Sequence, residues 1–186
     1  MEELILEAKK GNIEAFTLAI LNIKNDLYKI AKVKTSNEED IQDIIQETML
    51  NAYKNIKKLK DPSKFKSWII KILINNCNKY YKKKKILYNI DDYNIETYRD
   101  ILKYNHDKAL VEDTLTFYEI IQELKYDERI IIVLYYGERY TTKEISQILC
   151  INENTIKTRL ARAKEKIKKN YKGGHLWIIL TILWLM

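Results

Sequence analysis

The residues best suited to bind a polyanion follow Asn152, where small polar side chains give way to Lys and Arg. Asn154, Thr158 and Arg162 recur at intervals of four and therefore share one face of an α-helix. Amide and hydroxyl groups can reach base edges, while guanidinium and ammonium groups bind phosphates or guanine. The pattern predicts a helix that enters a groove of duplex DNA. Its candidate contacts are Asn154, Thr155, Lys157, Thr158, Arg159 and Arg162.

A shorter helix and a tight turn are expected just before this helix. Thr141 and Glu144 fit a capping box, and Asn152 can cap the second helix by accepting from its first-turn amides. Two further helices are expected between Thr114 and Gly137. Together these elements predict a helix-turn-helix module, with an ordinary amphipathic hairpin as the alternative. Its apolar stripes are Ile145, Ile148 and Leu149, then Ile156, Leu160, Ala163 and Ile167.

A second candidate surface lies on the helix expected around "DIQDIIQETMLNAYKNI". Asp43, Gln46, Glu47 and Leu50 stand at i, i+3, i+4 and i+7, so they form one acidic and amide patch with an apolar member. Such a patch suits docking on the basic helices of another protein. The alternative is a plain solvated face.

A third candidate surface follows the turn at Asp61 and Pro62. Phe65, Trp68, Ile69, Ile72 and Tyr80 are expected to pack inward, although Trp68 is also an aromatic candidate for the surface. Aromatic side chains beside cations suit single-stranded DNA, because bases stack on the rings while the cations neutralise phosphates. The candidate residues are Lys64, Lys66, Trp68, Lys71, Asn75, Lys79 and Lys82.

The elements that position these residues are expected to be helices. The 186 residues include one Pro and four Gly, so turn formers are scarce, and the net charge of +7 favours a polyanionic partner. Charge runs in blocks: eight Lys and no acid over 64–85, seven acids over 86–113, and eight bases over 157–172. We expect an all-α chain of two helical domains, 1–85 and 114–170, joined by an acidic linker, 86–113, with a tail at 171–186.

Enzymatic and metal chemistry are not expected. Cys77 and Cys150 lie far apart and His106 and His175 stand alone, so no metal spacing, disulfide framework or nucleophile–base set is visible. We expect no cofactor. The two separate cysteines favour a reduced, cytoplasmic compartment. The amino terminus mixes acids and bases through its apolar residues and is therefore not a signal peptide.

Four segments, "GNIEAF", "DIIQETMLNAY", "FKSWIIKILINN" and "TTKEISQILCINENTIKTRLARAKEKI", resemble in order and spacing the extracytoplasmic-function (ECF) sigma factors of bacterial RNA polymerase. The resemblance implies a non-catalytic factor whose partners are core RNA polymerase and promoter DNA, with an anti-sigma factor as a further candidate. Lys79 departs from the family pattern, which commonly has an acid there, as do Leu73 and Ile74. Cys150 occupies a turn where Gly is frequent.

The resemblance also assigns a role to each surface. Asp43, Gln46, Glu47 and Leu50 would dock on the clamp helices of the largest polymerase subunit. The segment from Asp61, with its basic helix, would open and read the −10 element, and the helix from Glu153 would read the −35 element. The acidic segment would thread through the polymerase near the RNA exit path.

The apolar tail "HLWIILTILWLM" is the least assigned segment. As a helix it would be roughly 18 Å long, short of the roughly 30 Å hydrocarbon core of a bilayer. Packing on the body, binding a partner and contacting a membrane all stay open. Besides the sigma factor, two other functions remain: an autonomous helix-turn-helix regulator, and a chain held at a membrane by its tail.

Overall fold

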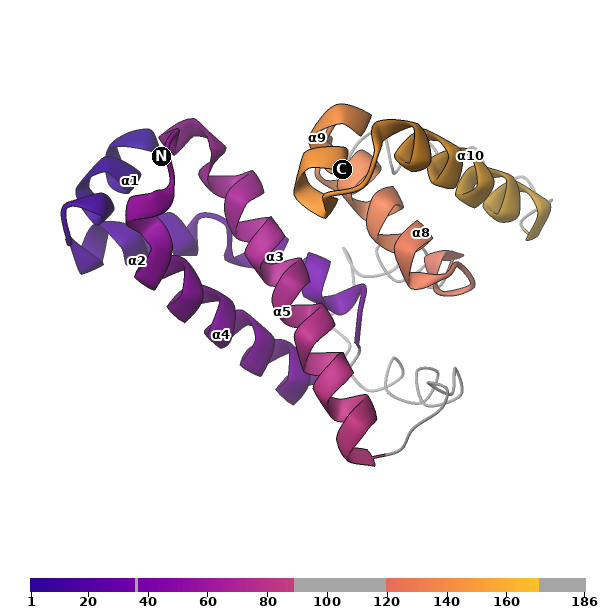
Figure 1. Ribbon diagram of the computed structural model, residues 1–186, viewed down its shortest axis with the longest axis horizontal. Helices are drawn as coiled ribbons and strands as arrows, with labels where there is room; N and C mark the ends of the chain where they lie inside the picture. Colours follow the sequence, from indigo (N-terminus) through magenta and orange to yellow (C-terminus); the bar gives the residue numbers. More distant parts are fainter. Residues whose placement is uncertain (36, 89–119, 171–186) are drawn as a thin grey trace, which may run out of the picture. The chain divides into compact units, whose positions relative to one another are not determined.

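The computed structural model describes residues 1–35, 37–88 and 120–170, which form helices and turns with no β-strand among them. The chain divides into two compact units, Met1–Tyr98 and Arg99–Met186 (Figure 1). The expected all-α fold with two helical domains is confirmed. Most of the expected acidic linker and the whole expected tail lie outside the described residues.

Five helices and two short 3₁₀ turns form the N-terminal unit. In chain order they are α1 (Glu2–Lys9), α2 (Ile13–Leu21), α3 (Lys24–Lys32), α4 (Glu38–Asn55), η1 (Ile56–Lys58), η2 (Pro62–Lys64) and α5 (Phe65–Tyr88). Helix α1 packs on α2, and α3 packs on both α4 and α5, which pack on each other. Asn12 and Asn37 cap α2 and α4 by accepting the backbone N–H groups of Ala15 and Asp40.

Helix α5 contributes many of the buried side chains of this unit. The expected inward residues Phe65 and Ile69 are fully buried, but Trp68, Ile72 and Tyr80 are only partly buried. Ile70, Leu73, Ile74, Cys77 and Tyr81 are buried instead. Contact of α5 with both α3 and α4 widens its apolar face beyond the single stripe expected from the sequence.

Buried polar groups fix how α4 lies along α5. Near the start of α4, the Asp40 carboxylate accepts hydrogen bonds from the Tyr80 hydroxyl at 2.9 Å and the Tyr81 hydroxyl at 3.2 Å. Further along, the buried Asn76 amide donates to the Thr48 hydroxyl at 3.1 Å. Any slip between the helices would leave these groups without partners, and an unpaired buried polar group is costly.

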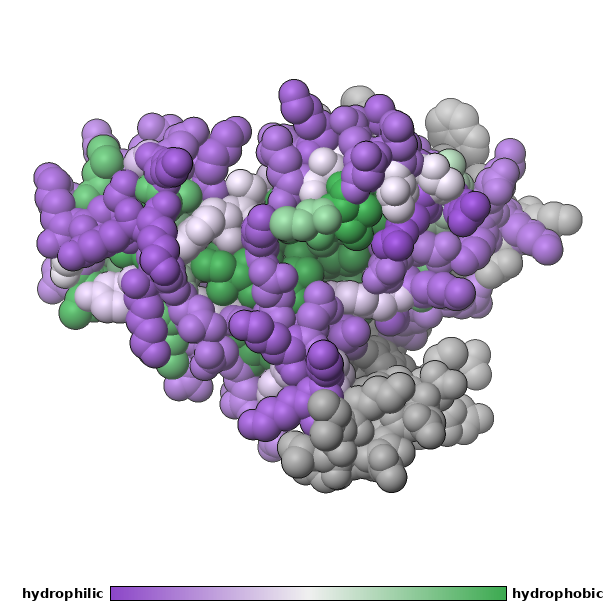
Figure 2. Space-filling model, in the orientation of Figure 1, coloured by the Kyte–Doolittle hydropathy of each residue, from purple (hydrophilic) through white to green (hydrophobic). Residues whose placement is uncertain are grey.

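The most exposed large apolar side chains of the N-terminal unit are Met1 and residues of α1, α2 and α4. The space-filling view shows apolar side chains of this unit lying among hydrophilic ones (Figure 2). Among the described residues, the large apolar side chains that are exposed are Met1, Leu6, Ile13, Leu18, Leu21, Leu50 and Tyr53. Among the described helices, none combines the length and the apolar character needed to cross a bilayer.

The C-terminal unit contains the expected helix-turn-helix. Its described elements are α8 (Tyr126–Ile132), a π-helical segment η3 (Val133–Gly137), α9 (Thr142–Leu149) and α10 (Glu153–Asn170). The capping box at Thr141 and Glu144 is present, with both reciprocal bonds made. Asn152 accepts the backbone N–H of Asn154 at 2.9 Å, as expected for a cap. Ile156, Leu160 and Ala163 are buried, whereas Leu149 and Ile167 are partly exposed.

The turn between α9 and α10 is made by a residue that rarely adopts its conformation. Cys150 has φ 56° and ψ 40°, the left-handed helical region, and its N–H donates to the carbonyl of Ser146. Glycine enters this region without a steric penalty, whereas a side chain costs about 1–2 kcal/mol. The left-handed conformation is therefore the usual one for a helix end, but a Cys in that conformation lowers the stability of the C-terminal unit.

We expect Cys150→Gly to raise the free energy of unfolding of the C-terminal unit by about 1 kcal/mol, because the strain at the turn is relieved. Urea unfolding of the full chain, followed by far-UV circular dichroism, measures the change. Cys150→Ala is the matched control: it removes the thiol but keeps a Cβ at the same φ, so it should leave stability nearly unchanged. Equal stability of both variants and the parent chain would contradict the role assigned to strain.

Candidate functional site

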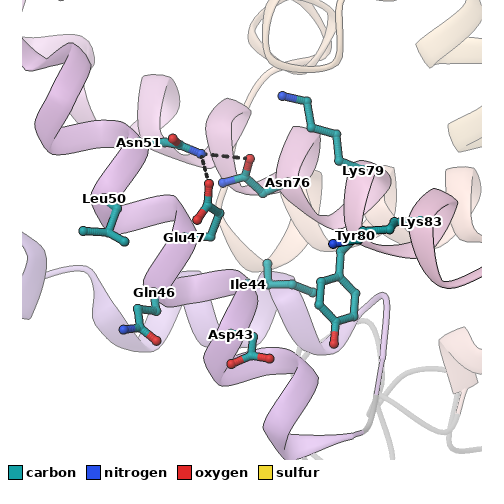
Figure 3. A pocket seen from close by; sticks show the side chains of 10 residues that line it. All are labelled: Asp43, Ile44, Gln46, Glu47, Leu50, Asn51, Asn76, Lys79, Tyr80 and Lys83. Carbon is teal, nitrogen blue, oxygen red and sulfur yellow. Dashed lines mark hydrogen bonds between the residues drawn. The ribbon is translucent and has the colours of Figure 1, made fainter.

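A groove between α4 and α5 brings the acidic patch together with part of α5. It is an open hollow of about 480 Å³ (Figure 3). We call it the α4–α5 groove. Its lining residues are Asp43, Ile44, Gln46, Glu47, Leu50 and Asn51 from α4, and Asn76, Lys79, Tyr80 and Lys83 from α5.

All four residues of the expected docking patch line this groove. Asp43, Gln46 and Glu47 are exposed, and Leu50 is exposed over 49% of its surface. The apolar positions between them, Ile44 and Ile45, are buried and hold α4 in place. The patch is therefore one continuous surface with two carboxylates, an amide and an exposed apolar side chain.

A chain of hydrogen bonds holds the carboxylate of Glu47 in place. The amide of Asn51 donates to Glu47 Oε1 at 2.9 Å and to the Asn76 carbonyl oxygen at 3.4 Å. Asn76 donates in turn to Thr48, whose hydroxyl donates to the carbonyl oxygen of Ile44 at 2.7 Å. A preorganised acceptor loses less side-chain entropy when it binds a cation.

The basic residues of α5 are distributed over two faces. Lys71, Asn75 and Lys82 follow one stripe at i, i+4 and i+11, where Asn75 and Lys82 are exposed and Lys71 is partly buried. Lys64 is exposed in η2, just before α5. The partly buried Trp68 lies against Phe65, with 6.1 Å between ring centroids. These positions are consistent with the expected aromatic and basic surface.

Two of the expected DNA contacts on α5 lie elsewhere. Lys66 forms an ion pair with Asp26 of α3, with 2.6 Å between Nζ and Oδ2. Lys79 lines the α4–α5 groove together with Asp43 and Glu47. Helical spacing alone could not locate either residue, because their neighbours come from other helices.

The outer face of α10 presents most of the expected duplex contacts. Asn154, Lys157, Thr158 and Arg162 are exposed, and Thr155 is partly buried. Arg159 differs: its guanidinium donates to Asp127 of α8 at 2.9 Å, and its side chain is 33% exposed. Arg159 therefore lies on the flank of α10 that faces α8.

Two acids at the start of α8 hold α10 in place, and the sequence reasoning did not single them out. Besides the contact of Asp127 with Arg159, the buried Glu128 carboxylate accepts from Lys166 at 2.7 and 2.8 Å. Arg159 and Lys166 stand seven residues apart, on one flank of α10. The sequence carries no local signal for this contact, because Asp127 and Glu128 lie 32 and 38 positions away in another helix.

A further hydrogen bond stabilises the ionised form of Glu128. Its carboxylate also accepts the backbone N–H of Lys125 at 3.1 Å, at the N-terminus of α8. Burial acts to raise the pKa of Glu128, but the hydrogen bonds from Lys166 and Lys125 and their positive charges outweigh burial. The pKa of Glu128 is therefore held below its ordinary value of 4.5.

The described residues contain no group of three or more His, Cys, Asp or Glu side chains that could hold a metal ion. Burial raises the pKa of the Cys77 thiol to about 12, so this thiol is protonated at neutral pH and is a poor nucleophile. Cys150 is exposed at the turn.

Comparison with known proteins places both units in one family. The family model for sigma-70 region 2 matches residues 20–86, and the model for sigma-70 region 4 matches residues 114–167. RNA polymerase sigma factor SigV of Bacillus subtilis is 35% identical over 156 residues, which cover 83% of this chain and 90% of SigV. ECF RNA polymerase sigma factor SigW of the same bacterium is 29% identical over 180 residues, covering 90% and 95% of the two chains.

Two solved structures share the fold. The sigma factor RpoE, in complex with the anti-sigma factor NepR from Bartonella quintana, matches with a TM-score of 0.70 and 19% identity over 87% of this chain and 99% of its own. CnrH, in complex with the cytosolic domain of CnrY, matches with a TM-score of 0.67 and 19% identity over 92% and 96%.

We expect Glu128→Gln to lower the free energy of unfolding by about 1–3 kcal/mol at pH 7, because the charged hydrogen bonds to Lys166 and Lys125 are weakened. A group with a lowered folded-state pKa stabilises the fold above its unfolded pKa. Its contribution is lost as pH falls through the folded value, so the difference between variant and parent should shrink below about pH 4.5.

Urea unfolding at several pH values measures this difference. Glu165→Gln is the control, since Glu165 is exposed on α10 and should show little effect at any pH. A pH-independent difference for Glu128→Gln would contradict the electrostatic origin.

Proposed function

The chain belongs to the extracytoplasmic-function sigma factors of bacterial RNA polymerase, and from this premise we propose a role for each of its surfaces. As a sigma factor it binds core RNA polymerase and directs promoter-specific transcription initiation. The observation that carries the assignment is the match of sigma-70 regions 2 and 4, in that order, to the two helical units. The proposals below concern which residues do the binding.

We propose that Asp43, Gln46, Glu47 and Leu50 dock on the clamp helices of the largest polymerase subunit. Three observations support this role: all four line one groove, they are exposed, and Glu47 is held by Asn51. Carboxylates on such a surface attract basic helices at long range, and the exposed Leu50 adds apolar area once contact is made.

The stripe of Lys71, Asn75 and Lys82 on α5, with Lys64 and Trp68 beside it, is proposed to bind the −10 element. Lysines attract the phosphates of a separated strand, and the partly exposed indole ring of Trp68 offers a surface for a base. The geometry gives less support to Lys66, because Asp26 neutralises it.

The outer face of α10 is proposed to read the −35 element in the major groove. Asn154 and Thr158 lie near the helix start, where recognition helices contact base edges, and Arg162 and Lys157 extend the basic face. Arg159 is proposed to position the helix rather than to contact DNA, because Asp127 accepts its hydrogen bond.

The remaining assignments follow from this role. We propose that residues 1–85 form the docking and −10 domain and residues 86–113 the acidic linker. Residues 114–170 are proposed as the −35 domain, and residues 171–186 as the tail. The chain supplies recognition while the polymerase supplies catalysis, in the cytoplasm where transcription takes place. Since RpoE and CnrH were each solved in complexes, an inhibitory anti-sigma partner is proposed for this chain as well.

The direct test is run-off transcription with bacterial core RNA polymerase over a library of promoter fragments, with and without the chain. Discrete new start sites that require the chain are expected, and their upstream sequences will define both promoter elements. The absence of new starts, together with site-specific binding of duplex DNA by the free chain, would contradict the assignment and indicate an autonomous regulator.

We expect Asp43→Lys combined with Glu47→Lys to weaken binding to core polymerase by at least tenfold, because both docking carboxylates become repulsive. Biolayer interferometry on immobilised core enzyme measures the affinity. Glu14→Lys is the control, since Glu14 is an exposed acid on α2 outside the groove. An equal loss for the control would indicate a general charge effect.

Arg162→Ala should lower transcription from promoters that carry the −35 element by about 10- to 100-fold if Arg162 contacts a base, the range for losing a bidentate contact. A matched fragment with a scrambled −35 element is the control, and on it the variant and the parent should perform alike. A uniform loss on both fragments would indicate a general defect in place of −35 reading.

A further inference from the structure

The α4–α5 groove carries opposite charges on its two sides. Asp43 and Glu47 come from α4, whereas Lys79 and Lys83 come from α5 (Figure 3). Lys79 and Lys83 are exposed, and in the described part of the chain neither forms an ion pair or a hydrogen bond. Two cations beside two carboxylates, without pairing to them, leave both sets of charge available to a ligand in the groove.

The nature of the groove argues against nucleic acid as its occupant. A phosphate backbone bound by Lys79 and Lys83 would lie in the same groove as Asp43 and Glu47, and the negative phosphates would be repelled by these carboxylates. Leu50 and Tyr80 line the same hollow and offer exposed apolar area that suits a protein side chain. Lys71, Asn75 and Lys82 do not line the groove that contains Asp43 and Glu47. Their stripe is therefore better suited to bind phosphates.

We propose that α5 supplies half of the polymerase-docking surface: Lys79 and Lys83 bind acidic side chains of the same polymerase helix whose basic side chains bind Asp43 and Glu47. This inference rests on the proposed docking role of α4. The occupant is a helix with basic residues along one flank and acidic residues along the other. Its apolar ridge lies over Leu50 and Tyr80.

The charge pattern gives specificity as well as affinity. A helix with basic residues only would bind Asp43 and Glu47 but would be repelled by Lys79 and Lys83, so the groove selects for both signs and for one orientation. Exposed ion pairs contribute little individually, so each Lys should matter by only a fewfold. Reversal of both charges replaces two attractions by two repulsions and should weaken core binding by about tenfold.

The test uses the full chain with Lys79→Glu and Lys83→Glu together. Affinity for immobilised core polymerase is measured by biolayer interferometry, and binding of a fluorescent single-stranded −10 oligonucleotide is measured on the assembled holoenzyme. Lys57→Glu with Lys58→Glu is the matched control, since these exposed residues of η1 change the net charge equally and lie outside the groove. Far-UV circular dichroism checks that each variant is folded.

The expected result is about tenfold weaker core binding for the Lys79 and Lys83 variant than for the control, with unchanged oligonucleotide binding once the holoenzyme is saturated. Core affinity equal to the control would overturn the inference, whether or not oligonucleotide binding falls; a fall would assign the two lysines to DNA. The Asp43→Lys and Glu47→Lys variant separates the two proposals. If it loses core binding while the lysine variant does not, the docking role of α4 stands and only the role of α5 fails.

Discussion

The packing of α4 against α5 is the constraint on which the N-terminal unit depends. Apolar side chains such as Ile41, Ile44 and Leu73 are buried in this unit, but the hydrophobic effect is non-directional. The bonds from Tyr80 and Tyr81 to Asp40, and from Asn76 to Thr48, select one register. In that register the outward residues of both helices surround the α4–α5 groove. The buried polar bonds therefore determine which side chains line the groove.

In the C-terminal unit, ion pairs fix the position of a helix, as buried hydrogen bonds do in the N-terminal unit. Helix α10 is short of apolar residues beyond Leu160 and Ala163, and its last two turns have little to bury. Glu128 and Asp127 hold it through Lys166 and Arg159. A helix held at two points one heptad apart cannot tilt freely, and a recognition helix needs a fixed angle to present its side chains to a groove.

Much of the fold could be predicted from the sequence because its signals are local. The capping box at Thr141, the cap at Asn152 and the spacing of the acidic patch each depend on residues within two helical turns, and the helices predicted around these residues were confirmed. The surroundings of Lys66, Lys79 and Arg159 depend on residues 28 to 40 positions away in other helices, such as Asp26 and Asp127. Helical periodicity carries no information about those neighbours.

The ion pairs between α8 and α10 also affect how strongly DNA binding by the basic segment, residues 157–172, should depend on salt. The sequence counts eight bases over 157–172, but Arg159 and Lys166 already have carboxylate partners. Each cation that displaces a counterion from duplex DNA adds about 0.9 to the slope of log affinity against log salt. Because Arg159 and Lys166 are paired with Asp127 and Glu128, they are less available to neutralise phosphates. The electrostatic footprint of this helix on DNA is therefore smaller than its composition implies, and more of its selectivity rests on contacts with base edges.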